Sequence, residues 1–283
     1  METFLLLALL ASPGCAQNAG PAACTTLMDA VSDSNASCLG ALLKKGADPD
    51  AKDPGTGTTP LMMAAQEGND PFVRALIKGG ARPDLSDNNG ETALFLAARA
   101  DKAGAVSILL DANAKPGTPD FSGTTPLMAA VQSGALPAEK ALLSRGANPN
   151  AADQSKTTPL MAAVAGGDAA SARLLLLYGA SADLKDSEEK TALDLAHDQG
   201  RTAIEKLLLP FVREGMTPLM LAAKEGDAAA VRFLLKRGND PRAKDVLGRT
   251  AYDYAAAEGR SEAMALLRPK PPKPNADNKR RGH

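Results

Sequence analysis

The chain has 283 residues, of which 44% are hydrophobic but only 3% aromatic, and its 32 basic and 33 acidic residues nearly cancel. This charge balance argues against a nucleic-acid-binding protein, which normally carries a basic face or stripe. Because aromatic side chains usually supply much of the buried area of one large core, their scarcity indicates many small cores in series.

The N-terminal segment contains an apolar run, from Phe4 to Ala11, that is too short to span a bilayer. Its length and the small residues after it are typical of a secretory signal peptide, with cleavage expected after Ala16. The alternative is a lipoprotein-type cleavage before Cys15, which places a lipid on that sulfur. No Lys or Arg precedes the run, which speaks against a signal, and a hydrophobic tail without a targeting role is the other alternative. We assign residues 1–16 to a signal peptide or a lipoprotein signal.

The cysteines can form a stable disulfide if the chain is exported, because disulfides persist in oxidising compartments. Cys24 and Cys38 then form an even pair, since Cys15 is removed or lipidated. A bridge requires Cα atoms within about 7 Å of each other. The repeat pattern places each cysteine at the start of one of two antiparallel helices, and such points are not natural neighbours. This geometry favours Cys38 as an unbridged core residue, and a disulfide is the alternative.

A repeated pattern fills the centre of the chain. A Thr followed two residues later by a large side chain recurs mostly at a spacing of 33 residues. A small pair, usually Ala-Ala, follows at a fixed offset, then a Gly, then an apolar pair, and most units close on Gly-Ala-Asx-Pro or a variant of it. The recurring threonines are Thr25, Thr59, Thr92, Thr125, Thr158, Thr191, Thr217 and Thr250.

Each position of the pattern has a physical role in a helix–turn–helix unit. The Thr hydroxyl caps an unpaired backbone N–H, and the Pro that often follows suits the first helical turn. The Ala pair lets neighbouring helices approach closely, and the next Gly ends the first helix in a left-handed conformation. The second helix carries its apolar pair inward and ends at another Gly, which Asn113 replaces in the third unit.

The pattern closely resembles the ankyrin repeat, whose motif reads T-P-L-H near the first helix and L-L-x-x-G-A-D-x-N at its close. The resemblance covers residues 22–268 as eight units. It implies an all-α fold, an ankyrin-repeat solenoid of about eight helix–turn–helix units with short hairpin loops. It also implies that the protein binds another protein.

The motif His is replaced by Met in five units. In the family that His joins a hydrogen-bond network between units. Met is not expected to make these hydrogen bonds, so we expect its side chains to fill the core instead. An oxidant-scavenging role is the less favoured interpretation, although thioethers oxidise readily. The five residues are Met28, Met62, Met128, Met161 and Met220.

Units six and eight share a Thr-Ala-x-Asp start that is common in terminal ankyrin units. Unit six is also shortened, because 26 residues rather than 33 separate Thr191 from Thr217. We infer a break in the superhelix near Pro210, where the usual hairpin segment is missing. Residues 22–212 are assigned to repeats one to six, and residues 213–268 to repeats seven and eight.

The last segment, residues 269–283, is rich in Pro and carries five basic residues and one acidic residue. It offers no large apolar side chain to bury, so we expect a disordered basic tail.

Catalytic motifs are not found in the sequence. The chain has two His, no Gly-x-Ser-x-Gly elbow and no Gly-Lys pair of a phosphate-binding loop. Recurring carboxylates such as Asp87 stand a full repeat apart and match the turn Asp of the family, which bonds to nearby backbone groups. We therefore expect no enzymatic activity, no metal site and no cofactor.

A partner protein is expected on the hairpin tips and on the exposed face of the first helices, which stacking does not constrain. Phe121 is an aromatic residue at a predicted exposed tip, where an interface anchor is expected, and packing against the neighbouring hairpin is the alternative. The predicted partner-binding residues are Asn88, Asn89, Glu91, Arg99, Phe121, Ser122, Thr124, Gln132, Gln154, Ser155, Thr157 and Lys190.

These features favour a monomeric, non-catalytic interaction scaffold in the bacterial envelope, periplasmic or anchored to the outer membrane. Its partner is an unidentified protein rather than nucleic acid, and membrane contact is expected only through a lipid at Cys15. One alternative is a cytosolic or host-directed ankyrin interaction module. Another is an accessory protein for oxidative-stress protection in the envelope, because some periplasmic members of the family are linked to that role.

Overall fold

The computed structural model describes residues 24–268. The expected signal segment at residues 1–16, including Cys15, and the expected tail at residues 269–283 lie outside the described residues. Sixteen helices and two isolated β-bridges make up the regular structure of the described part, which confirms the all-α prediction. The helices pair into eight helix–turn–helix units.

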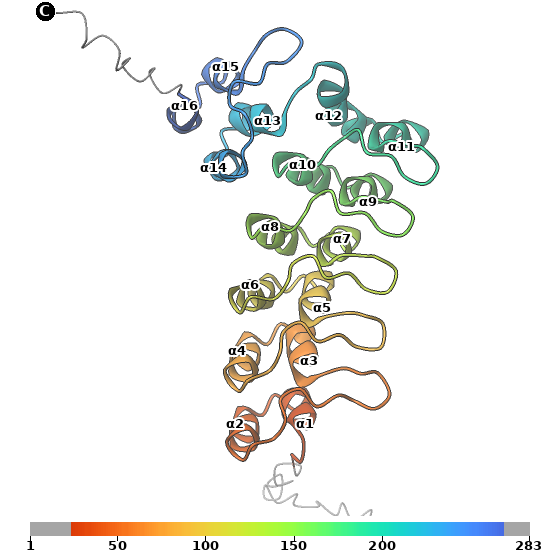
Figure 1. Ribbon diagram of the computed structural model, residues 1–283, viewed down its shortest axis with the longest axis vertical. Helices are drawn as coiled ribbons and strands as arrows, with labels where there is room; N and C mark the ends of the chain where they lie inside the picture. Colours follow the sequence, from red (N-terminus) through yellow and green to blue (C-terminus); the bar gives the residue numbers. More distant parts are fainter. Residues whose placement is uncertain (1–23, 269–283) are drawn as a thin grey trace, which may run out of the picture.

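The first helices of units one to six lie side by side in one column, and their second helices form a parallel column beside it, on the left in Figure 1. The first helices are α1 (Leu27–Ser32), α3 (Pro60–Glu67), α5 (Ala93–Arg99), α7 (Pro126–Gln132), α9 (Pro159–Gly166), α11 (Ala192–Asp198), α13 (Pro218–Glu225) and α15 (Ala251–Ala257). The second helices are α2 (Ala36–Lys44), α4 (Asp70–Lys78), α6 (Ala103–Asp111), α8 (Leu136–Ser144), α10 (Ala169–Leu177), α12 (Thr202–Arg213), α14 (Ala228–Lys236) and α16 (Ser261–Leu267).

Local residue choices set the helix boundaries. A Thr hydroxyl accepts a hydrogen bond from the third residue of each first helix, as Thr125 does from Met128. Unit one begins its helix one residue later than the pattern predicts, because Thr26 is the capping residue. Gly68 ends α3 with φ of 74°, and Asn113 takes φ of 63° where other units have Gly.

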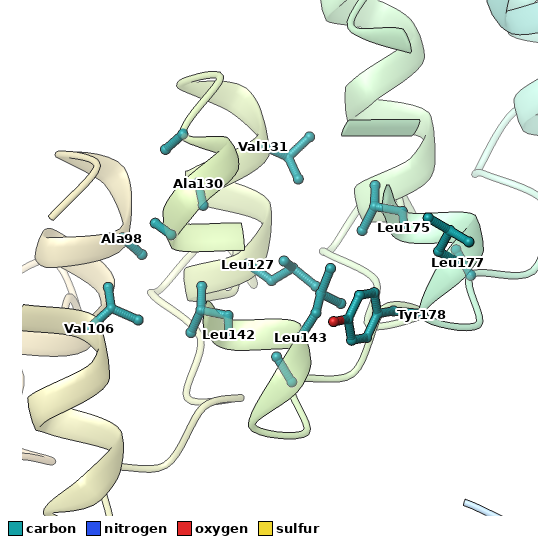
Figure 2. Close-up of a cluster of buried hydrophobic side chains, with 14 of the residues drawn as sticks. Ala98, Val106, Leu127, Ala130, Val131, Leu142, Leu143, Leu175, Leu177 and Tyr178 are labelled. Carbon is teal, nitrogen blue, oxygen red and sulfur yellow. The ribbon is translucent and has the colours of Figure 1, made fainter. Parts of the chain in front are cut away.

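The core is a continuous series of small clusters between successive units. Ala97 and Ala98 of α5 are fully buried, as are Leu142 and Leu143 of α8. Figure 2 shows one stretch of this core, which runs from Ala98 through the fourth unit to Tyr178. Because Ala adds so little volume, first helices of adjacent units pack closely and each unit depends on its neighbours for burial.

Four of the five Met residues fill the core, whereas Met28 is half-buried, and three of the four accept a hydrogen bond inside their own unit. Met62, Met161 and Met220 are at most 1% exposed. The backbone N–H of Thr59 donates to the Met62 sulfur at 3.3 Å, and units five and seven repeat this contact at 3.4 Å. These bonds lie within one unit, where the thioether acts as a weak acceptor for the N–H three residues before it, and they are not the hydrogen bonds between units that the His of the family makes.

The first unit carries a disulfide between Cys24 and Cys38, whose Cα atoms lie 6.3 Å apart. The repeat pattern had placed the two cysteines at the starts of two antiparallel helices, too far apart for a bridge. That prediction of unbridged cysteines was wrong. Cys24 precedes α1 in a segment that is not helical, and Cys38 lies in the first turn of α2. This non-helical segment brings Cys24 beside α2, a position that the spacing of two antiparallel helices does not reveal.

The stack changes direction after unit six. α12 has 12 residues, three more than α10, and Pro210 lies inside it rather than at its end. The carbonyl oxygen of Pro210 accepts the N–H groups of Glu214 and Met216, and the chain then turns at Gly215 with φ of 68°. As a result α13 packs against α10 instead of stacking on α11, and units seven and eight lie to one side of the column (Figure 1).

Candidate partner-binding surfaces

The hairpin loops project from the column of first helices and are joined to one another (Figure 1). The N–H of Phe121 donates to the carbonyl oxygen of Asn89 at 3.1 Å, and the N–H of Gln154 donates to that of Ser122 at 3.3 Å. Within one hairpin, an Asp carboxylate such as Asp153 accepts two backbone N–H groups. We call this connected row of tips, residues 86–91, 119–124, 152–157 and 185–190, the hairpin ridge.

The hairpin ridge and the adjacent ends of the first helices carry most of the predicted binding residues at the surface. Three of the predicted residues are half-buried, namely Thr124, Thr157 and Lys190. Eight are exposed, namely Asn88, Asn89, Arg99, Phe121, Ser122, Gln132, Gln154 and Ser155.

Glu91 does not belong to the accessible surface, contrary to the sequence-based expectation. Its side chain is buried, with 8% of the residue exposed, and it forms an ion pair with Arg99. The second contact of that pair joins Arg99 Nη2 to Glu91 Oε2 at 3.1 Å. Because Arg99 also lies over the Phe95 ring, the pair fixes the base of the hairpin, and only the Arg99 side is open to a partner.

Two of the predicted polar residues bind neighbouring hairpins through their side chains. The amide of Asn88 donates to the carbonyl oxygen of Gly55 at 3.0 Å, and that of Gln154 donates to Phe121 at 2.8 Å. Lys190 is also engaged, because its ammonium group lies 2.9 Å from a carboxylate oxygen of Asp198. These side chains therefore stabilise the ridge as well as lining it.

Phe121 occupies the same position of its hairpin as Asn88 and Gln154, but its ring has no hydrogen-bond donor. The residue is 72% exposed, the largest exposure among the large hydrophobic residues described. One edge of the ring lies against Gly90, where an added Cβ would come within 2.8 Å of a ring carbon. One edge of the ring thus packs on the neighbouring hairpin, as the alternative interpretation expected, while most of the ring is open to solvent.

Val246 and Leu247 form a second exposed apolar tip that the predicted set omits. They are 67% and 69% exposed, and Val246 follows Asp245 as Phe121 follows Asp120. That correspondence is the signal that could have identified them. Burial alone raises the pKa of Asp245, but hydrogen bonds from Arg249 and Tyr254 lower it to about 2. The Asp245 side chain is therefore an ionised hydrogen-bond acceptor that stabilises the base of this tip.

The larger hollows among residues 24–268 lie away from the hairpin ridge. The first has a volume of about 360 Å³, lies where the stack changes direction, and is called the break cleft here. The second has a volume of about 1010 Å³ at the outer side of unit eight, next to Arg268, where the described residues end. The break cleft is lined by Arg173, Lys206, Leu207, Pro210, Phe211, Met216, Leu221, Lys224, Glu225, Glu258 and Arg260.

Glu139 is a fully buried carboxyl group inside the stack. Burial raises its pKa to about 7, against the opposing effect of a 2.6 Å hydrogen bond from Ser171, and nearby Asp168 and Asp101 raise it further. Its second oxygen has no hydrogen-bond partner, and no described hollow is lined by Glu139. This arrangement concerns stability rather than chemistry on a substrate.

Residues 24–268 contain no cluster of three or more His, Cys, Asp or Glu side chains arranged to hold a metal ion. In the same range, none of the helices has the length and apolar character that crossing a bilayer requires.

Comparison with known proteins agrees with the repeat architecture. The family model described as "Ankyrin repeats (3 copies)" matches four overlapping stretches, residues 27–120, 61–153, 127–212 and 209–279. Over 55 residues the chain is 46% identical to a protein of Neurospora crassa named "Ankyrin repeat protein nuc-2". That match covers 19% of the chain and 5% of the relative, so the chain spans a small part of the relative's length.

Proposed function

Because the chain belongs to the ankyrin-repeat family, whose repeats are protein–protein interaction modules, we propose that it is a non-catalytic scaffold for a partner protein. The partner binds along the hairpin ridge and the adjacent first-helix ends. The protein acts outside the cytoplasm, in a bacterial envelope, either free in the periplasm or anchored through a lipid on Cys15.

The exposed ring of Phe121 is the observation that carries the binding proposal. The chain has few aromatic residues, at 3%, yet one of them lies at a hairpin tip with 72% exposure. A large exposed apolar side chain on a rigid, hydrogen-bonded ridge is typical of an interface anchor, because burying it on binding releases water at little cost in ordering.

The disulfide of unit one supports the proposed location. Cys24 and Cys38 are bonded, and they follow closely on the apolar N-terminal run that the sequence suggests as a signal. Disulfides persist in oxidising compartments and are rare in the cytosol. The mass of the mature protein from fractionated cells tests this location. A retained N-terminus with free thiols in the cytosolic fraction would establish the cytosolic alternative instead.

The test of binding is Phe121→Ala. We expect partner affinity to fall by about tenfold, because truncation of an anchoring aromatic typically costs 1–2 kcal/mol or more. The partner is first identified by cross-linking in the native host, and affinity is then measured by calorimetry. The melting temperature should stay within about a degree of the parent value, since exposed side chains contribute little to stability.

Leu136→Ala is the matched control, because Leu136 is an exposed apolar residue at the start of α8, in the column of second helices. It should leave affinity unchanged. A large fall in the melting temperature of Phe121→Ala with binding intact would show that the ring serves the fold and not the partner.

The oxidative-stress role stays an alternative within this proposal. Met62, Met128, Met161 and Met220 are at most 1% exposed, so an oxidant in solution does not reach their sulfur atoms in the folded protein. A protective role would therefore act through the bound partner rather than through these four buried Met residues.

A further inference from the structure

The break cleft exists because α13 packs against α10 rather than continuing the stack. It is lined by side chains from five places, namely α10, α12, the α12–α13 connection, α13 and the turn between α15 and α16. Its volume of about 360 Å³ is at the small end of the range for ligand sites in proteins, about 300–1,000 Å³. A cleft of this size accommodates one or two side chains of a partner.

The floor of the break cleft is apolar. Met216 and Leu221 are buried, at 8% and 6% exposed, and Leu207 and Phe211 are half-buried beside them. Pro210 completes the α12 wall and has no backbone N–H to donate. An apolar side chain would bury hydrophobic surface here, whereas a small inorganic anion would be poorly solvated.

The rim of the break cleft is basic. Arg173 Nε lies 2.6 Å from Glu225 Oε1, so those two charges offset each other. Lys206 and Lys224 are exposed and form no ion pair with any residue between 24 and 268. Together the rim carries four basic side chains, Arg173, Lys206, Lys224 and Arg260, against two acidic ones, Glu225 and Glu258.

We propose that the break cleft binds an acidic peptide segment of a partner protein. An apolar side chain of the segment enters the floor, and flanking Asp or Glu side chains meet Lys206 and Lys224. The inference rests on the proposed interaction function but adds a second site, distant along the chain from Phe121. The site depends on the break between units six and seven, which a regular stack of repeats does not have.

The test uses short synthetic peptides and the full chain. One fluorescent peptide carries a Leu-Phe pair flanked by Glu residues, and its counterpart carries Lys in place of each Glu. Fluorescence anisotropy should show binding of the acidic peptide that weakens as salt is added, since exposed charges are screened. The double variant Lys206→Glu/Lys224→Glu should weaken that binding by about tenfold or more.

The matched control is Lys78→Glu/Lys140→Glu, which makes the same change of net charge at exposed lysines of α4 and α8. It should leave peptide binding unchanged, and so should Phe121→Ala. Equal binding of both peptides, equal weakening by both charge-reversal pairs, or displacement of the peptide by an equal concentration of inorganic phosphate would overturn the proposal. Loss of native partner binding in Phe121→Ala with normal peptide binding would separate the two sites.

Discussion

Single buried side chains in this protein affect stability through the hydrogen bonds that they accept or leave unmade inside the stack of repeats. The sulfur of Met161 accepts the N–H of Thr158 while the Thr158 hydroxyl accepts the N–H of Met161, so a thioether completes a capping box. Glu139 is the opposite case, because one of its buried carboxyl oxygens has no partner. The cost of such a group depends on its protonation, which makes stability sensitive to pH.

Glu139→Gln should stabilise the protein at pH 8 and have little effect at pH 4. The pKa of Glu139 is raised from 4.5 to about 7. Between these two pH values the folded state therefore keeps a proton that the unfolded state releases. Stability from this group is therefore present below about pH 4.5 and is lost as pH rises through 7. The variant should gain up to about 3 kcal/mol at pH 8, measured by urea unfolding across pH. Equal pH slopes for both proteins would contradict this.

At the scale of single elements, the end units and the shortened unit depart most from the regular repeat. Unit six has polar, exposed residues on α11, including Asp194, His197 and Asp198, as a terminal unit requires. Its second helix runs on through Pro210, although Pro removes one helical hydrogen bond. The unit therefore ends one run of repeats, and the first helix of the next run, α13, packs on α10.

Reduction of the disulfide should loosen unit one and leave the middle units unchanged. The bridge between Cys24 and Cys38 closes a loop with a sequence separation of 14 residues. Such a loop is worth about 3 kcal/mol, and in a repeat protein the effect stays near the affected unit. Hydrogen exchange with and without reductant measures this, with α7 and α8 as the internal reference. A Cys24→Ser/Cys38→Ser variant should behave as the reduced protein does, and unchanged exchange in α1 and α2 would refute the prediction.

For the whole molecule, the orientation of units seven and eight depends on the α10 surface. The rings of Tyr178 and Phe233 lie 5.1 Å apart, and Arg173 and Glu225 form the ion pair beside the break cleft. Tyr178 is buried, at 4% exposed, and lies beside Leu143 of the first run (Figure 2), while its ring contacts Phe233 of the second run. The two runs are thus joined by packing as well as by the chain.

Tyr178→Ala should weaken that junction. Removal of a buried aromatic side chain typically costs about 3–5 kcal/mol. We expect faster hydrogen exchange in α13 and α14 and a broader or two-step thermal transition, with α3 and α5 unaffected. Tyr252→Ala is the control, because Tyr252 is half-buried at the outer side of unit eight and does not contact the junction. A single sharp transition lowered equally in all units would show that the runs are not separable.

The sequence by itself determined the repeat, the all-α fold, the helix starts and the hairpin turns, because Thr, Pro, Gly, Asn113 and the turn Asp residues act on backbone within a few positions. It also identified Phe121 as a tip residue, since that position follows the same turn. Only the tertiary structure decided the bonding of Cys24 to Cys38, the burial of Glu91 against Arg99, and the packing of α13 on α10. These features join residues through space, so no local preference encodes them, and the break cleft follows from the last of them.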